Sequence, residues 1–141
     1  MAVEVTKSAT VGMSVEDVWE KVGGWCAIST WHPAIETCAE SRDGETLKRL
    51  LTLGDGGQIH ERLIGENETS YSYAIEKSPL PFKNYEATIS VEADEKDADK
   101  TVVTWTSNFD ADGKPDKEVQ ELVAGIYEGG LNNIVKMLSS K

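Results

Sequence analysis

The sequence predicts a single α+β domain, in which an antiparallel sheet packs against one long C-terminal helix. Three observations support this prediction. Six consecutive stretches between residues 34 and 109 alternate apolar and polar side chains, and turn residues separate them. No helical segment interrupts these stretches, which disfavours the parallel sheet of an α/β protein. Residues 116–139 carry a sustained apolar stripe with helical spacing.

The first elements are a strand and a short helix. Residues 2–11 alternate in part and predict the strand. Ser14 can cap the helix that follows, and Gly23 and Gly24 end it. The apolar positions of this helix have the spacing i, i+3, i+4 and i+7: Val15, Val18, Trp19 and Val22.

Six strands then follow in sequence. They are expected at residues 34–41, 46–53, 58–65, 70–78, 84–93 and 101–109. The separating turns are Asp43-Gly44, "GDGG", "ENET", "PLPF" and "DEKDADK". Together with the first strand they predict a sheet built as a meander.

The last element is a long helix that Asp116 could cap and that ends near Ser139. Its stripe comprises Val119, Leu122, Val123, Ile126, Tyr127, Leu131, Ile134, Val135 and Leu138. Gly125, Gly129 and Gly130 lie within this helix, and each glycine lowers helix stability by roughly 0.5–1 kcal/mol relative to alanine. Gly130 lies on the stripe, where the missing side chain permits close packing against the sheet or leaves room for a ligand.

Alternation along the strands sorts their side chains between an inner and an outer face. The inner set contains two charged residues, Arg49 and Glu61, on neighbouring strands. Isolated buried charges are very unfavourable, so the two should pair, form hydrogen bonds or meet water. They would then form a polar spot inside an aromatic hollow, which is typical of a ligand pocket. The alternative is a register shifted by one residue, with both charges in solvent.

Charge and composition exclude several functions. The chain has 25 acidic and 14 basic residues, a net charge of −11 and no basic run, which disfavours nucleic acids and anionic membranes as partners. No apolar run approaches the ~20 residues that span a bilayer, and no secretory signal begins the chain. A cytoplasmic protein is therefore expected. Cys26 and Cys38 are expected to be reduced, buried thiols.

With these residues in place, the whole chain, 1–141, resembles the polyketide cyclase/dehydrase branch of the START-like, helix-grip superfamily (SRPBCC). The resemblance rests on "WHP", "GGQIHERL", "YSYAI", "LPFKNYEATISV", "VTWTSNF" and the terminal amphipathic helix, in this order. It implies a seven-stranded antiparallel sheet that wraps around the C-terminal helix and encloses a cavity. Superfamily members bind lipids, sterols, hormones, polyketides or aromatic compounds, and only some are catalysts, so the fold does not define a reaction.

Three residues are candidates for acid–base catalysis. Glu61 could act if buried, because desolvation raises and Arg49 lowers the pKa of its carboxyl. Tyr73 could donate a hydrogen bond to a ligand carbonyl or simply pack in the core. His32 could transfer protons near neutrality or hydrogen-bond within its loop. No metal or cofactor is expected: the histidines and cysteines lack ligand spacing, and "NFDADG" lacks the closing glutamate of a calcium loop.

The stretch "WCAISTWHP" lies between the first helix and the second strand. Trp25 and Ile28 are expected to pack this corner, and Trp31 and His32 to lie at the cavity opening. The full set of expected ligand-binding residues is Trp31, Arg49, Tyr71, Phe82, Tyr85, Trp105, Ile126, Tyr127 and Gly130.

Three functions fit these expectations. The first is a carrier or sensor of a small apolar or aromatic molecule, whose carbonyl or carboxylate Arg49 could hold. The second is a metal-free enzyme of cyclase, dehydratase or hydratase type. The third is an accessory protein that uses its cavity to hold a partner. A monomer or weak homodimer is expected.

Overall fold

All seven strands form one antiparallel sheet, in the order β1-β7-β6-β5-β4-β3-β2. The computed structural model describes residues 2–139. Its elements are β1 (Ala2–Val11), α1 (Val15–Val22), α2 (Ile28–Trp31), β2 (Ile35–Asp43), β3 (Thr46–Leu53), β4 (Gln58–Asn67), β5 (Ser70–Lys77), β6 (Phe82–Ala93), β7 (Thr101–Ala111) and α3 (Asp116–Ser139). The predicted meander is confirmed, and β1 joins it by pairing with β7.

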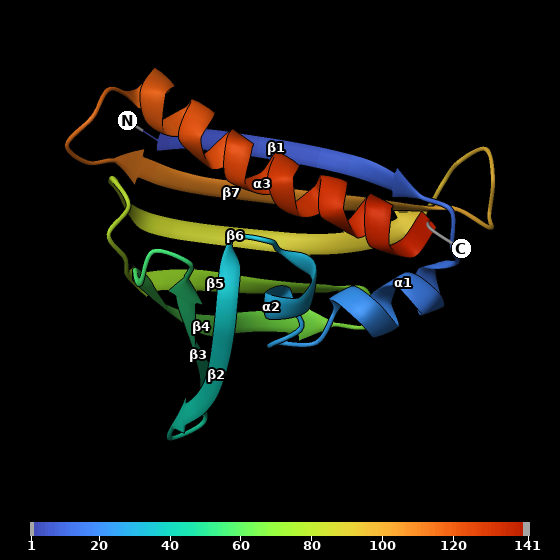
Figure 1. Cartoon of the computed structure of the whole chain (residues 1–141), viewed down its shortest axis with the longest axis horizontal. Helices are drawn as coiled ribbons and strands as arrows, with labels where there is room; N and C mark the ends of the chain where they lie inside the picture. Colours follow the sequence, from blue (N-terminus) through green and yellow to red (C-terminus); the bar gives the residue numbers. More distant parts are fainter. Residues whose placement is uncertain (1, 140–141) are drawn as a thin grey trace.

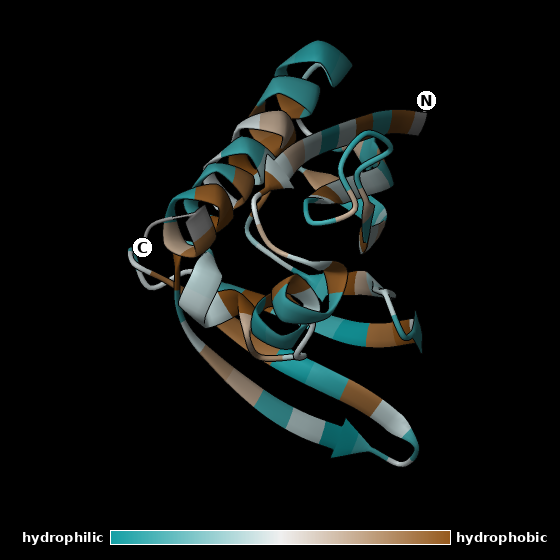
Figure 2. Ribbon diagram, turned by 90° about the vertical axis from the view of Figure 1, so that its right-hand side faces the viewer, coloured by the Kyte–Doolittle hydropathy of each residue, from teal (hydrophilic) through white to brown (hydrophobic). Residues whose placement is uncertain are grey.

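The sheet is strongly curved, and α3 lies along its inner face over β1 and β7 (Figure 1). The short helices α1 and α2 connect β1 to β2 and cover the other half of that face. Apolar and polar residues alternate along the strands and around α3 (Figure 2). Within residues 2–139, no helix combines the length and apolar character needed to cross a bilayer.

The helix ends follow the local sequence. The Ser14 hydroxyl accepts a hydrogen bond from the Asp17 amide at 3.3 Å, and the Gly23 amide donates to the Trp19 carbonyl at 2.8 Å. α3 starts one residue earlier than a cap at Asp116 would imply, because Asp116 is its first residue. Its carboxylate is still within the first turn, where negative charge is favourable.

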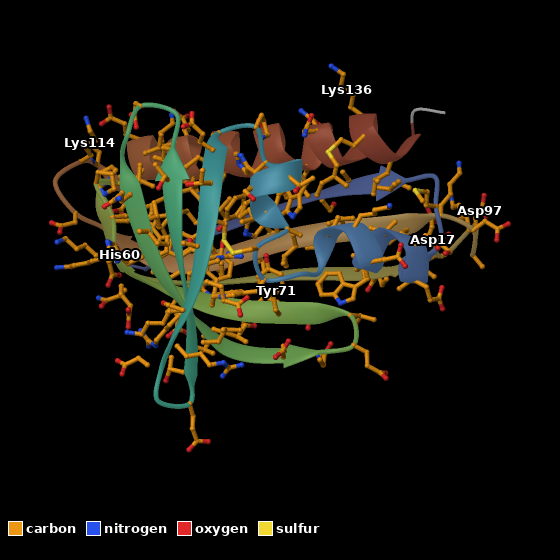
Figure 3. All side chains as sticks on the ribbon, turned by 60° about the horizontal axis from the view of Figure 1, so that its bottom comes forward. Asp17, His60, Tyr71, Asp97, Lys114 and Lys136 are labelled. Atoms are coloured by element: carbon orange, nitrogen blue, oxygen red, sulfur yellow. A yellow bond between two sulfur atoms is a disulfide. The ribbon has the colours of Figure 1, made fainter. Side chains whose placement is uncertain are left out.

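The strand register places Arg49 opposite Glu61 in the β3–β4 pair. Arg49 is 2% exposed and Glu61 4% exposed, so the inward parity is confirmed and the solvent-facing alternative is wrong. His60, which directly precedes Glu61 on β4, lies at the periphery of the molecule, whereas Tyr71 lies in the interior (Figure 3).

The glycines of α3 play two different roles. A Cβ atom at Gly130 would lie 2.7 Å from His32 Cδ2, 2.9 Å from Trp31 Cζ3 and 3.1 Å from Trp105 Cζ3. Gly130 therefore permits close packing of α3 on these rings and leaves no room for a ligand. Gly125 and Gly129 face open space.

Cys26 and Cys38 form a disulfide bond, with Cα atoms 5.5 Å apart. The expectation of two reduced thiols was wrong. The cause is tertiary: the segment between α1 and α2 folds back onto β2, which brings together two cysteines separated by 12 positions. The bond ties the residue after Trp25 to the second strand.

We predict that replacing both cysteines, Cys26→Ser with Cys38→Ser, lowers the free energy of unfolding by about 3 kcal/mol, because a loop of this length is no longer closed in the unfolded chain. Urea denaturation measures the change. Adding a reductant to the wild-type protein should cause a similar loss, and the double variant should not respond to it. Equal stability of all three samples would contradict the prediction.

Candidate functional site

An internal cavity of about 50 Å³ lies between the concave face of the sheet, α2 and α3. Its apolar lining is Ile28, Ile35, Leu51, Ile59, Ile75, Leu80, Phe82, Val123 and Ile126. The side chains with polar atoms are His32, Glu61, Tyr73, Tyr85, Trp105 and Tyr127. A single water requires roughly 10–15 Å³ of such volume, so the cavity has room for about three to five waters.

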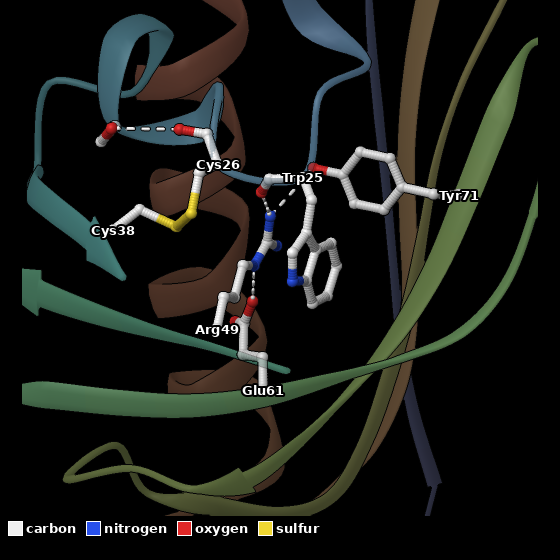
Figure 4. Close-up of a disulfide and its surroundings, with 7 residues drawn as sticks. Trp25, Cys26, Cys38, Arg49, Glu61 and Tyr71 are labelled. Atoms are coloured by element: carbon white, nitrogen blue, oxygen red, sulfur yellow. Dashed lines mark hydrogen bonds and ion pairs between the residues drawn. A yellow bond between two sulfur atoms is a disulfide. The ribbon is translucent and has the colours of Figure 1, made fainter. Parts of the chain in front are cut away.

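The charged pair at this cavity is buried, and Figure 4 shows its contacts. Arg49 Nε donates to Glu61 Oε1 at 2.6 Å. Arg49 Nη1 donates to the Trp25 carbonyl and, at 3.3 Å, to the Tyr71 hydroxyl. The guanidinium carbon lies 4.0 Å from the Trp25 ring centroid and 5.0 Å from that of Tyr73. Cation–π contacts thus supplement the ion pair.

Burial and the neighbouring charge shift the pKa of each member of the pair in opposite directions. Burial raises the pKa of the Glu61 carboxyl, and the guanidinium of Arg49 counteracts part of that rise. Burial by itself would lower the pKa of Arg49, but the Glu61 carboxylate and the Tyr71 and Tyr73 hydroxyls outweigh it and raise this pKa. Arg49 therefore stays charged.

Glu61 lines the cavity, and Arg49 does not. Glu61 is part of the lining, whereas the guanidinium lies behind it among Trp25, Tyr71 and Tyr73. Within the described chain, Glu61 Oε2 makes no hydrogen bond, while Oε1 is used by Arg49. The lining therefore offers a carboxylate acceptor in place of the cation that the sequence suggested for holding a ligand.

Three tyrosines add hydroxyl groups to the same lining. Trp105 Nε1 donates to the Tyr73 oxygen at 3.0 Å, and the Tyr73 and Tyr85 hydroxyls interact as well. The Tyr85 and Tyr127 hydroxyls are hydrogen-bonded to each other. Burial raises the pKa of all three hydroxyls, so they are neutral donors.

His32 is held by hydrogen bonds at both ring nitrogens. Nε2 must be the donor to the Ile126 carbonyl at 2.9 Å, and Nδ1 then accepts from the Ala34 amide at 3.1 Å. This fixes the neutral imidazole in one tautomer. Burial lowers its pKa, although the bond to Ile126 opposes this. The ring would have to give up a partner before it could transfer a proton.

The expected site residues fall into two groups. The cavity lining includes His32, Glu61, Tyr73, Phe82, Tyr85, Trp105, Ile126 and Tyr127. Four others, Trp31, Arg49, Tyr71 and Gly130, lie outside it. A role in ligand binding or catalysis stays a prediction for each of the twelve.

The expected opening at Trp31 and His32 was wrong. Trp31 is 0% exposed and His32 3% exposed. The Trp31 ring packs edge-on against Trp105 at 5.3 Å, and its carbonyl accepts from Asn133 Nδ2 at 2.8 Å. These contacts hold α2 against α3 and β7. Ile28 lines the cavity, and Trp25 packs on Arg49, so both residues occupy the corner as expected.

Several lining residues were absent from the sequence-based set: Ile28, Ile35, Leu51, Ile59, Ile75, Leu80 and Val123. Inward strand parity marks Leu51, Ile59 and Ile75, and the helical stripe marks Val123, but neither pattern distinguishes cavity lining from filled core. Leu80 lies in the β5–β6 loop, where no periodicity applies. Within residues 2–139, no group of three or more His, Cys, Asp or Glu side chains could hold a metal ion.

A family model described as polyketide cyclase / dehydrase and lipid transport matches residues 2–138. Among curated proteins, none matches this chain. The protein XoxI from Bacillus cereus has a similar structure, with 31% sequence identity, a TM-score of 0.91, and coverage of 98% of this chain and 96% of that one. An uncharacterised protein from Bacillus thuringiensis shares 32% identity, with a TM-score of 0.89 and coverage of 96% and 98% respectively.

A more distant structure is the Zhui aromatase/cyclase from a Streptomyces species. Its sequence is 16% identical, the TM-score is 0.77, and the alignment covers 98% of this chain and 94% of that one. At this identity the match shows a shared fold alone.

We predict that folding stability falls as the pH drops through about 6.5, the ordinary pKa of an unfolded histidine. Because burial lowers the pKa of His32, the unfolded chain takes up a proton there that the folded protein does not. The stabilisation is complete above that pH and is lost below it. Denaturation at several pH values measures this slope.

The variant His32→Gln should flatten the slope between pH 7 and 5.5, and His60→Gln, at the other histidine, should retain it. The same slope in wild type and His32→Gln would show that another group controls acid stability.

Proposed function

This chain belongs to the polyketide cyclase, dehydrase and lipid transport family, as its sequence indicates, and from this premise we propose that it binds one small apolar or aromatic molecule in the cavity between the sheet and α3. Its proposed role is that of a carrier or sensor. The proposal is supported by a lining of aliphatic and aromatic side chains with a few converging polar groups, which is the usual composition of a small-molecule site.

One observation carries the proposal. The Glu61 carboxylate and the Tyr73 hydroxyl place an acceptor and a donor in one largely apolar lining, and Glu61 Oε2 makes no hydrogen bond within the described residues. A bound molecule with a complementary donor and acceptor would hydrogen-bond to both groups. We therefore propose a ligand that carries a hydroxyl or carbonyl group on an apolar skeleton.

The cavity must enlarge to admit such a molecule. Its volume of about 50 Å³ is far below the roughly 300–1,000 Å³ of typical ligand pockets. Leu80 and Phe82 are the best placed to move, because they lie in or next to the β5–β6 loop, whereas α2 is clamped beneath α3. We propose that binding displaces these two side chains.

A second candidate function is acid–base catalysis, which the same two groups favour. Burial raises the pKa of Glu61, as suits a general base near neutrality, and the neutral Tyr73 hydroxyl could stabilise an enolate oxygen. In such a step Glu61 takes the proton α to a carbonyl, and the electron pair of the C–H bond moves onto the carbonyl oxygen. This would be an enolisation of the kind that cyclases and dehydratases require.

The compartment and the oligomeric state remain proposals. We propose a cytoplasmic monomer or weak homodimer, on the grounds given by the sequence. The Cys26–Cys38 bond weighs against the cytoplasm, because disulfides are rare in reducing compartments.

We predict that the neutral probe phenylnaphthylamine binds the wild-type protein with an increase in fluorescence, and that Ile59→Phe weakens binding at least about tenfold by filling the cavity. The matched control is Ile64→Phe, since Ile64 is 44% exposed on the same strand. Thermal unfolding confirms that each variant is folded. The proposal fails if the wild-type protein does not bind the probe, or if both variants bind it equally well.

The catalytic candidate predicts that the protein accelerates deuterium exchange at the α-carbon of tetralone in heavy water, measured by NMR. Tyr73→Phe should slow this exchange by about 10²-fold or more while phenylnaphthylamine still binds, since it removes the donor for the enolate oxygen. Tyr71→Phe is the control, because Tyr71 lies outside the lining. Exchange at the uncatalysed rate with wild-type protein would rule out this function.

A further inference from the structure

The sheet has a gap on its outer face between β5 and β6. Pairing of these strands ends at Ala74 and Glu86, although β5 continues to Lys77 and β6 begins at Phe82. The β6–β7 pair shifts register between Lys83 and Glu86, and Asn84 within that interval has a left-handed backbone with φ of 55°. Asparagine tolerates this conformation, and its Nδ2 donates to Asp110 Oδ2 at 2.9 Å. The divergence of the strands is therefore built into the sheet.

A groove of about 590 Å³ occupies this gap. It adjoins the internal cavity, because Ile75, Phe82 and Tyr85 line both. Phe82 is 9% exposed and Tyr85 4% exposed, so these side chains form a thin wall between the two spaces. Movement of Phe82, already implied by the small cavity, would join them.

The groove is more basic than the chain around it. Its charged side chains are Arg62, Lys77, Lys83, Glu76 and Glu86. Arg62 is neutralised by Glu76 at 3.5 Å, and Glu76 also contacts Lys48 at 3.2 Å. Lys77 and Lys83 make no ion pair with any residue of the range 2–139. In a chain with a net charge of −11, two unpaired lysines in a groove beside the cavity form a local positive site.

We infer that the groove holds the anionic head of an amphiphile whose apolar part occupies the cavity. This inference rests on the proposed function and specifies its ligand class: an aromatic or aliphatic acid, in place of a fully neutral molecule. Lys77 and Lys83 attract the head, and Glu86 opposes it. The apolar part passes the wall at Phe82 and reaches the lining that contains Tyr73.

The size of the two spaces agrees with this division. The groove alone has the volume of a typical ligand site but is open and polar, so it would hold a solvated head group. The cavity is lined mostly by buried apolar side chains, so it would hold the part that avoids water. Because Lys77 and Lys83 are exposed, their attraction for the head should weaken as salt is added.

The experiment compares two fluorescent probes of similar aromatic shape, the anionic anilinonaphthalene sulfonate and the neutral phenylnaphthylamine. The double variant Lys77→Gln/Lys83→Gln should weaken binding of the anionic probe about tenfold and flatten its salt dependence. Binding of the neutral probe should not change. Glu86→Gln should tighten binding of the anionic probe, because it removes the opposing charge. The matched control is Lys96→Gln/Lys100→Gln, at the turn between β6 and β7.

The outcomes separate the inference from the proposed function. If neither probe binds the wild-type protein, the proposed function fails and the inference fails with it. If both probes bind but the Lys77/Lys83 variant behaves like the Lys96/Lys100 control, the cavity binds ligands and the inference is overturned. If both probes weaken equally in the Lys77/Lys83 variant, the lysines do not recognise charge, and the inference is again overturned. Opposite shifts in the lysine and Glu86 variants support it.

Discussion

The ion pair between Arg49 and Glu61 is the constraint on which the rest of the structure depends. Two full charges lie inside a core of aromatic rings, and each would be prohibitive without the other. Their 2.6 Å contact requires the β3–β4 register that sets the residues opposite each other. Nη1 of the guanidinium donates to the Trp25 carbonyl and to the Tyr71 hydroxyl, whereas Nη2 has no partner among the described residues. The disulfide at the next residue, Cys26, holds that segment against β2.

The orientation of the pair determines the chemistry of the cavity. Arg49 Nε and Nη1 are directed at Glu61, Trp25 and Tyr71, so the Glu61 carboxylate, and not the guanidinium, is the charged group in the cavity lining. The tyrosine hydroxyls around it are neutral, since burial raises the pKa of each. The cavity is thus a place for a molecule that donates to a carboxylate and accepts from a phenol. Among the described residues that line the cavity or the groove, the lysines and the arginine lie in the groove between β5 and β6.

The fold was predictable from the sequence because it depends on local patterns. Strand alternation gave the inner face correctly, including the two charges, and the stripe of α3 gave the long helix. The errors concern contacts between distant segments. The bond between Cys26 and Cys38 requires the α1–α2 segment to fold back on β2, which no periodicity encodes. From the sequence, Gly130 is compatible either with space for a ligand or with close packing of α3. The structure shows close packing, because the rings of Trp31, His32 and Trp105 lie against this glycine.

The site was predictable in composition but not in arrangement. Parity placed Arg49 and Glu61 on the same face, but it could not tell which of them meets the cavity. That depends on Trp25, whose ring and carbonyl come from a segment without strand pattern. The expected opening at Trp31 failed for a similar reason, since the packing of α2 under α3 closes that side. The gap between β5 and β6 begins where their pairing ends at Ala74 and Glu86, beside a register shift in the β6–β7 pair, and alternation alone reveals neither.

A double-mutant cycle on the ion pair tests this account most directly. The free energy of unfolding would be measured for wild type, Arg49→Met, Glu61→Met and the double variant. Each single variant leaves one buried charge unpaired, so each should lose about 3–5 kcal/mol, and the double variant should lose clearly less than their sum. Additive losses would contradict the account, because they would show that the two charges do not depend on each other.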